Sequence, residues 1–130
     1  MSAAVAVIKP LRRPVLWATL WWLAVLFVVV VCLIPPPPLP VPENGDKVEH
    51  FLAYFILAGS AVQLYRRGRP LLWVGAGLVL MGIGIEFAQG ALTTTRSADP
   101  MDALANSVGV LAGLGTALTP LRDLLLRWRG

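Results

Sequence analysis

The sequence predicts an all-α, polytopic membrane protein: four transmembrane helices in a compact bundle, with both termini in the cytoplasm. Of its 130 residues, 57% are hydrophobic and 14% are charged, whereas soluble domains carry about 45–50% apolar and about 25% charged residues. Several apolar stretches reach the ~20 helical residues that a ~30 Å hydrocarbon layer requires. A chain this short suggests one domain. We therefore expect a cytoplasmic segment at 1–14 and a single transmembrane domain at 15–130.

The first predicted helix, residues 15–34, contains no charged residue. Its apolar core is longer than the ~7–15 residues of a cleavable signal peptide, so we expect the helix to be retained. Residues 35–47 follow and are rich in proline. Proline ends a helix because it lacks the amide proton, and a run of prolines favours an extended strut. We expect a stiff outer loop here.

Three further helices are predicted at residues 48–65, 71–92 and 101–118. The last of them carries small residues at spacings of three and four, which places them on one helical face. These residues are Asn106, Gly109, Gly113 and Ala117. Because lipid provides no hydrophobic drive for helices to associate, membrane helices approach one another through such small faces. We expect this face to point into the bundle.

Basic residues set the predicted orientation. With four spans, one side of the membrane receives nine of them: Lys9, Arg12, Arg13, Arg66, Arg67, Arg69, Arg122, Arg127 and Arg129. The other side receives only Lys47 and Arg96. Basic residues stay cytoplasmic in short loops, so both termini should be inside. No nucleic-acid partner is expected, because the nine residues are scattered over three flanks and do not form one basic face.

Polar residues gather at the outer ends of the last three predicted helices. His50 lies near the outer start of one, Glu86 near the outer end of the next, and Asp102 in the first turn of the last. Ionisable groups within spans cost at least ~2.5 kcal/mol at the membrane centre, usually face the protein interior and mark function. We expect one polar site there, formed by Asp46, Lys47, His50, Tyr54, Glu86, Gln89, Arg96, Asp99, Asp102 and Asn106.

Within this set, His50, Glu86 and Asp102 are the candidate catalytic residues, because imidazole exchanges protons near neutral pH and a carboxylate in a low-dielectric helix end can act as an acid or a base. The other seven are candidate ligand-binding residues. Arg96 suits a phosphate, which a guanidinium binds through its planar fork. A lone histidine is a weak indication of zinc, so the sequence assigns no metal ligand and requires no cofactor.

Three motifs resemble those of the VanZ-like family of small bacterial membrane proteins. They are "DKVEHFLAYFILAG" from residue 46, "GIGIEFAQ" from residue 82 and "TRSADPMDALANSVGVLAG" from residue 95. The family pattern maps onto the ten candidate residues and Gly109. The resemblance spans residues 46–118. It implies a multi-pass protein of the bacterial cytoplasmic membrane, and the family name implies a link to resistance against the glycopeptide teicoplanin.

Three interpretations of the polar site remain open. The site binds a cell-envelope lipid, a lipid-linked envelope precursor or a glycopeptide without changing it. Alternatively, it is an acid/base enzyme for transfer or hydrolysis on a lipid-linked envelope substrate. In the third interpretation the polar groups pair with one another only to stabilise buried helix ends, and Asp99 caps the last helix before Pro100. The sequence predicts no oligomeric state and leaves open whether a divalent cation binds.

Overall fold

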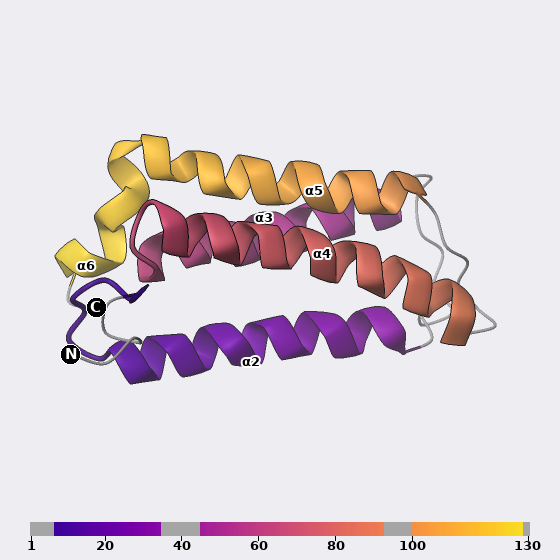
Figure 1. The fold of residues 1–130 in the computed structure, drawn as a ribbon, viewed down its shortest axis with the longest axis horizontal. Helices are drawn as coiled ribbons and strands as arrows, with labels where there is room; N and C mark the ends of the chain where they lie inside the picture. Colours follow the sequence, from indigo (N-terminus) through magenta and orange to yellow (C-terminus); the bar gives the residue numbers. More distant parts are fainter. Residues whose placement is uncertain (1–6, 35–44, 93–99, 129–130) are drawn as a thin grey trace.

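The computed structural model describes residues 7–34, 45–92 and 100–128, which are almost entirely helical. The all-α prediction is confirmed. The helices are α2 (Pro14–Leu33), α3 (Gly45–Leu64), α4 (Arg69–Leu92) and α5 (Pro100–Gly115), followed by short turns η1 (Thr116–Leu118) and η2 (Pro120–Asp123) and by α6 (Leu124–Trp128). The four long helices lie side by side and alternate in direction, and α6 folds across the end where both termini lie (Figure 1).

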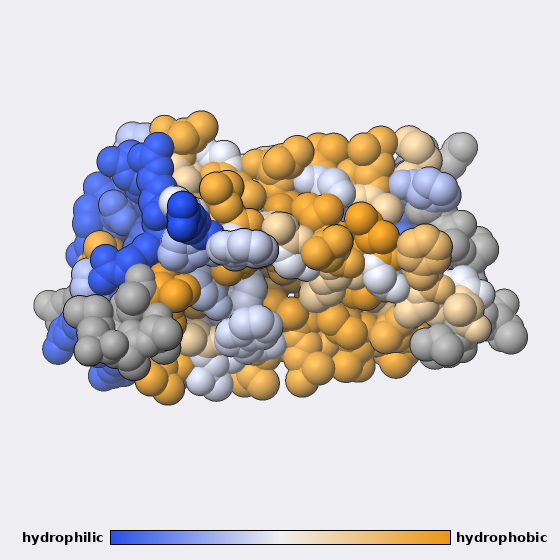
Figure 2. All heavy atoms as spheres, in the orientation of Figure 1, coloured by the Kyte–Doolittle hydropathy of each residue, from blue (hydrophilic) through white to orange (hydrophobic). Residues whose placement is uncertain are grey.

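Within the described ranges, three helices are long and apolar enough to cross a membrane: Pro14–Leu33, Arg69–Ala91 and Pro100–Leu118. The first is apolar all round and buries only Trp21 and Val25. A helix of this composition that leaves Phe27 68% exposed is suited to lipid contact. Figure 2 shows the resulting band of hydrophobic residues across the middle of the molecule.

Helix α3 is as long as α2, with 20 residues, but it is not among these three apolar helices. Its first turns contain Asp46, Lys47 and Glu49. It contacts α2, α4 and α5, and its buried residues include Tyr54 and Ala58, both 0% exposed. Neighbouring helices therefore cover much of α3.

The packing of α3 against α5 depends on two glycines. A Cβ atom at Gly109 would lie 2.5 Å from the carbonyl oxygen of Phe51, and one at Gly113 would lie 2.7 Å from that of Phe55. Gly109, Gly113 and Ala117 are all buried, so the predicted small-residue face does point into the bundle. The backbones approach this closely because the glycines have no side chain.

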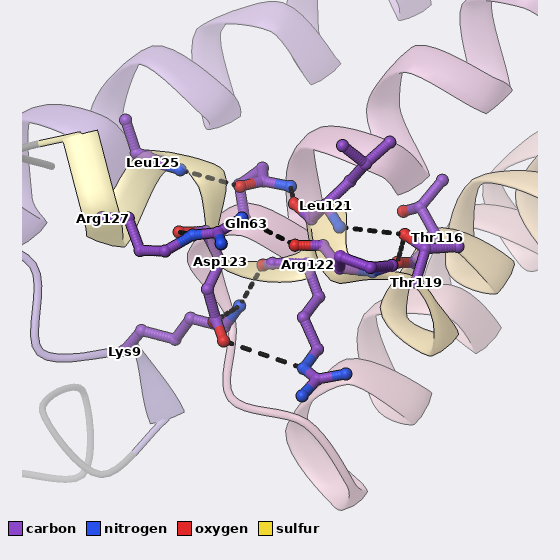
Figure 3. A network of polar contacts seen from close by, with 10 residues as sticks. Lys9, Gln63, Thr116, Thr119, Leu121, Arg122, Asp123, Leu125 and Arg127 are labelled. Atoms are coloured by element: carbon purple, nitrogen blue, oxygen red, sulfur yellow. Dashed lines mark hydrogen bonds and ion pairs between the residues drawn. The ribbon is translucent and has the colours of Figure 1, made fainter.

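Polar contacts close the end of the bundle that we call the terminal end, which comprises residues 7–13, the α3–α4 turn and residues 116–128. Figure 2 shows hydrophilic residues gathered there, and Figure 3 shows part of the network. Gln63 on α3 donates to the carbonyl oxygen of Leu121 at 2.7 Å and accepts from the amide of Leu125 at 3.0 Å. Lys9 donates to Asp123 Oδ1 at 2.9 Å. These bonds attach both η2 and α6 to the bundle.

The turn between α3 and α4 requires a glycine. Gly68 has a φ of 100°, a backbone conformation that side chains with a Cβ rarely adopt. Just before this turn, the N-terminal segment is attached to α3 by a bridge between Ile8 and Tyr65. The turn reverses the chain, so that the start of α3 and the end of α4 lie together at the opposite end of the bundle (Figure 1).

Candidate functional site

Five predicted site residues meet at the end opposite to the terminal end. Among the residues whose burial the structure describes, the buried polar and charged side chains are His50, Glu86, Gln89, Asp102 and Asn106, each 8% exposed or less. They come from the start of α3, the end of α4 and the start of α5. The alternating helix directions bring these three segments together.

His50 and Asn106 form the hydrogen bond that joins α3 to α5 within this cluster. The two atoms, His50 Nδ1 and Asn106 Oδ1, lie 3.0 Å apart. An amide oxygen can only accept, so this contact is a hydrogen bond in the tautomer that carries the proton on Nδ1. In the neutral ring Nε2 then has a lone pair, available to accept a hydrogen bond or to bind a cation. The bond also fixes the orientation of the imidazole.

Two carboxyl groups lie beside this imidazole. His50, Glu86 and Asp102 each offer one ligand atom, and these three atoms lie within 4.8 Å of one another. Lys47 Nζ forms an ion pair with Asp102 Oδ1 at 3.4 Å, although no described residue gives this oxygen a contact with hydrogen-bond geometry. The distance and the missing alignment agree with an electrostatic contact that is weaker than a direct hydrogen bond.

Tyr54 lies one helical turn beyond His50 on α3. Its side chain is fully buried, its hydroxyl has no hydrogen-bond partner in the described part of the chain, and it interacts electrostatically with Glu86. Asn106 Nδ2 is likewise without a hydrogen bond to any described residue. Native proteins rarely leave such groups unsatisfied, because each one costs its full desolvation penalty.

Gln89 lies three residues after Glu86 on α4 and is 2% exposed. Its amide nitrogen donates to the carbonyl oxygen of Cys32 at 2.7 Å. That carbonyl is in the last turn of α2, where backbone acceptors lack partners within the helix. The bond therefore attaches α2 to α4 beside the site. The predicted ligand-binding role of Gln89 stays a prediction.

The remaining predicted residues are described in part or not at all. Arg96 and Asp99 lie in residues 93–99, outside the described residues, as does the proposed helix cap at Asp99. Asp46 is in the first turn of α3, but its side chain is outside the description. Lys47 is half-buried.

Gly82 belongs to the site, although the sequence analysis did not single it out. A Cβ atom there would lie 3.0 Å from Asn106 Nδ2 and 3.4 Å from Tyr54 Cε1. The glycine provides the space that both polar side chains occupy. The sequence could have indicated this glycine, because Gly82 lies four residues before Glu86 and this spacing places both residues on one face of α4.

Comparisons with known proteins find no match to a family model, to a curated protein or to a solved structure. The site must therefore be judged by its chemistry. It contains an oriented imidazole, two carboxyl groups with one ammonium group nearby, and a buried hydroxyl. These groups can exchange protons or bind a cation, and they can form hydrogen bonds with a polar ligand.

Proposed function

We propose that this chain is a VanZ-like integral protein of the bacterial cytoplasmic membrane. In this proposal the polar cluster faces outward and binds a cell-envelope lipid, a lipid-linked envelope precursor or a glycopeptide, and thereby affects envelope properties or antibiotic susceptibility. The observation that carries it is the placement of the buried polar side chains of α3, α4 and α5 together at one end of an otherwise apolar bundle. Such groups are costly in a membrane and usually mark function.

The proposed topology has four spans, with α3 crossing beside the three more apolar helices. Helix α3 has enough residues to cross, since ~20 suffice, and its neighbours shield much of its surface from lipid. The terminal end carries Lys9, Arg66 and Arg122 among its basic residues. Under the positive-inside rule this end is cytoplasmic, which makes the polar cluster extracytoplasmic.

Two unsatisfied groups favour ligand binding over a purely structural network. A self-contained network pairs its buried donors and acceptors, since unpaired ones are destabilising. The Tyr54 hydroxyl and Asn106 Nδ2 have no such partner among the described residues. A polar head group that enters between α3, α4 and α5 would supply hydrogen bonds to both.

An acid/base enzyme is the second candidate function, and the hydrogen bond from His50 to Asn106 favours it. A fixed ring with Nε2 available is the arrangement that a general base requires. Glu86 and Asp102 each place a carboxylate oxygen within 4.8 Å of a ring nitrogen of His50, and a nearby negative charge stabilises a protonated imidazole. The reaction class would be transfer or hydrolysis on a lipid-linked envelope substrate at the outer leaflet.

Mass spectrometry on purified chain incubated with bacterial envelope lipids tests both candidates. Binding predicts that wild-type protein retains a lipid unmodified and that His50→Ala loses it, while the control Gln63→Ala at the terminal end retains it. A new product that depends on His50 would identify an enzyme. Identical lipid profiles for wild type and His50→Ala, with no product, would contradict a functional site.

The topology has its own test, because Cys32 is the single cysteine of the chain. In a Cys32→Ala background, a membrane-impermeant maleimide applied to whole cells should label Ala98→Cys. It should label Arg67→Cys only after the membrane is opened. The reverse pattern would place the polar cluster on the cytoplasmic side and contradict the proposed orientation.

A further inference from the structure

We propose that His50, Glu86 and Asp102 bind a divalent transition-metal cation, of which Mn²⁺ and Zn²⁺ are the test cases. Three helices each contribute one residue, so the site exists only in the assembled bundle. The three ligand atoms lie within 4.8 Å of one another. Metal–ligand bonds of about 2.0–2.2 Å place two ligands of one ion at most about 4.4 Å apart. Small side-chain adjustments therefore suffice to close the site on a cation.

The imidazole is oriented as a metal ligand requires. Metal-binding histidines almost always donate their other ring N–H to an acceptor, which fixes the tautomer and presents the remaining nitrogen to the metal. His50 Nδ1 lies 3.0 Å from Asn106 Oδ1, and in the tautomer in which Nδ1 donates this hydrogen bond, Nε2 has the lone pair that can bind a cation. Asn106 is only 1% exposed, so water does not readily compete for this bond.

A second observation, independent of the three ligands, also indicates an occupant. Tyr54 is 0% exposed and its hydroxyl has no hydrogen-bond partner in the described part of the chain. The hydroxyl lies within electrostatic range of Glu86. A three-ligand metal site keeps open positions for water. A water molecule on the cation would offer this hydroxyl a partner.

The ammonium group of Lys47 does not prevent a cation from binding Asp102. Its Nζ atom lies 3.4 Å from Asp102 Oδ1. The Lys47 side chain is 28% exposed, and its long stem allows the ammonium group to move toward water when a cation takes its place.

The ligand types select the class of cation. Mg²⁺ and Ca²⁺ prefer ligand sets made of oxygen alone, and Ca²⁺ takes six to eight of them. One imidazole with two carboxylates suits Mn²⁺ or Zn²⁺, as mixed nitrogen and oxygen sites do. A site with three protein ligands would leave positions free for a phosphate or carboxylate of a lipid head group. The inference thus deepens the proposed function and rests on it for the identity of that outer ligand.

The experiment uses the full chain in detergent, with no polyhistidine tag and no added lipid. His50 is the only histidine, so a nitrogen signal from histidine in pulsed electron paramagnetic resonance of bound Mn²⁺ can come from this residue alone. Elemental analysis after dialysis should find one Mn²⁺ or Zn²⁺ per chain. Glu86→Gln and Asp102→Asn should weaken binding by at least ~10-fold. Asp123→Asn, which removes a carboxylate at the terminal end, should leave it unchanged.

Absence of stoichiometric Mn²⁺ and Zn²⁺ would overturn the inference, as would bound Mn²⁺ without the histidine nitrogen signal. Equal losses in Asp123→Asn and Glu86→Gln would overturn it too, because the binding would then be nonspecific. If the two site variants fail to fold, the nitrogen signal of the wild-type chain decides. Metal binding without lipid retention would contradict the proposed lipid function alone, and lipid retention without metal binding would contradict the metal site alone.

Discussion

At the terminal end of the bundle, polar side chains pair with defined partners near the surface. Gln63 uses both its donor and its acceptor on the backbone of the C-terminal segment, and Lys9 binds Asp123. At the opposite end, polar side chains are buried, and the Tyr54 hydroxyl and Asn106 Nδ2 have no hydrogen-bond partner among the described residues. Under our proposal, the polar groups of the terminal end stabilise the fold, whereas those of the opposite end leave hydrogen-bonding groups for a ligand.

The largest expected effect comes from separating α3 from α5 beside the buried cluster. Gly109→Ala places a methyl group 2.5 Å from the carbonyl oxygen of Phe51, the residue after His50. Because backbone must shift, we expect a loss of about 1–3 kcal/mol in the free energy of unfolding and a weaker contact between His50 and Asn106. Denaturation of the purified protein in detergent measures the loss.

Gly77→Ala is the matched control for that substitution. A Cβ at Gly77 meets no atom within 4 Å, and alanine is favoured over glycine in a helix by about 0.5–1 kcal/mol. The control should therefore be neutral or stabilising. Equal destabilisation by both substitutions would show that the close approach of α3 and α5 is not what holds the buried end together.

A paired substitution compares the two ends directly. Gln63→Ala removes two hydrogen bonds and should lower the free energy of unfolding by about 1–2 kcal/mol. Tyr54→Phe removes a hydroxyl that has no hydrogen-bond partner in the described residues. The free energy of unfolding should therefore change by less than about 0.5 kcal/mol. The same substitution should abolish ligand binding. A larger destabilisation by Tyr54→Phe than by Gln63→Ala would contradict this assignment, because the buried cluster would then contribute more to stability than the terminal end.

The smallest effect concerns pH at the terminal end. The hydrogen bond from Lys9 holds the pKa of Asp123 below its ordinary value. A carboxyl group whose pKa is lower in the folded state stabilises the protein above its unfolded pKa, and this stabilisation disappears as the pH falls through the folded pKa. Wild type should thus be slightly more stable than Asp123→Asn at about pH 7, and the difference should vanish as the pH falls below the folded pKa of Asp123.

Salt provides the check on this assignment. The Asp123 side chain is 38% exposed, so added salt should screen its ion pair. A difference between wild type and Asp123→Asn that persists at high salt and at low pH would rule out the electrostatic explanation.

The sequence predicted the positions along the chain more fully than the contacts between helices. Helical spacing alone identified the buried face through Gly109 and Gly113. Alternating helix directions predicted that His50, Glu86 and Asp102 lie at the same end, because each is near the corresponding end of its helix. Both predictions depend on regular helix geometry, which the sequence pattern determines.

Individual contacts could not be predicted, because they depend on how each helix is rotated and how closely it approaches its neighbour. The pairing of His50 with Asn106 accompanies a close approach of α3 and α5 at Gly109 and the proximity of Gly82 to Asn106. The hydrogen bond from Gln89 to the carbonyl oxygen of Cys32 forms only if the end of α2 lies beside α4. No motif in the sequence indicates that these two helix ends are neighbours. The part of Gln63 in attaching α6 was likewise missed, because the sequence predicted no return of the C-terminal segment across the bundle.

Glu86→Gln, assayed for melting temperature and retained lipid in the same preparation, tests the central claim most directly. This claim is that the buried polar cluster is a binding site. Glutamine matches glutamate in size and removes only the charge. The account predicts that the melting temperature stays close to that of wild type while retained lipid is lost. A marked fall in melting temperature with retained lipid unchanged would contradict it and would make the cluster a structural network.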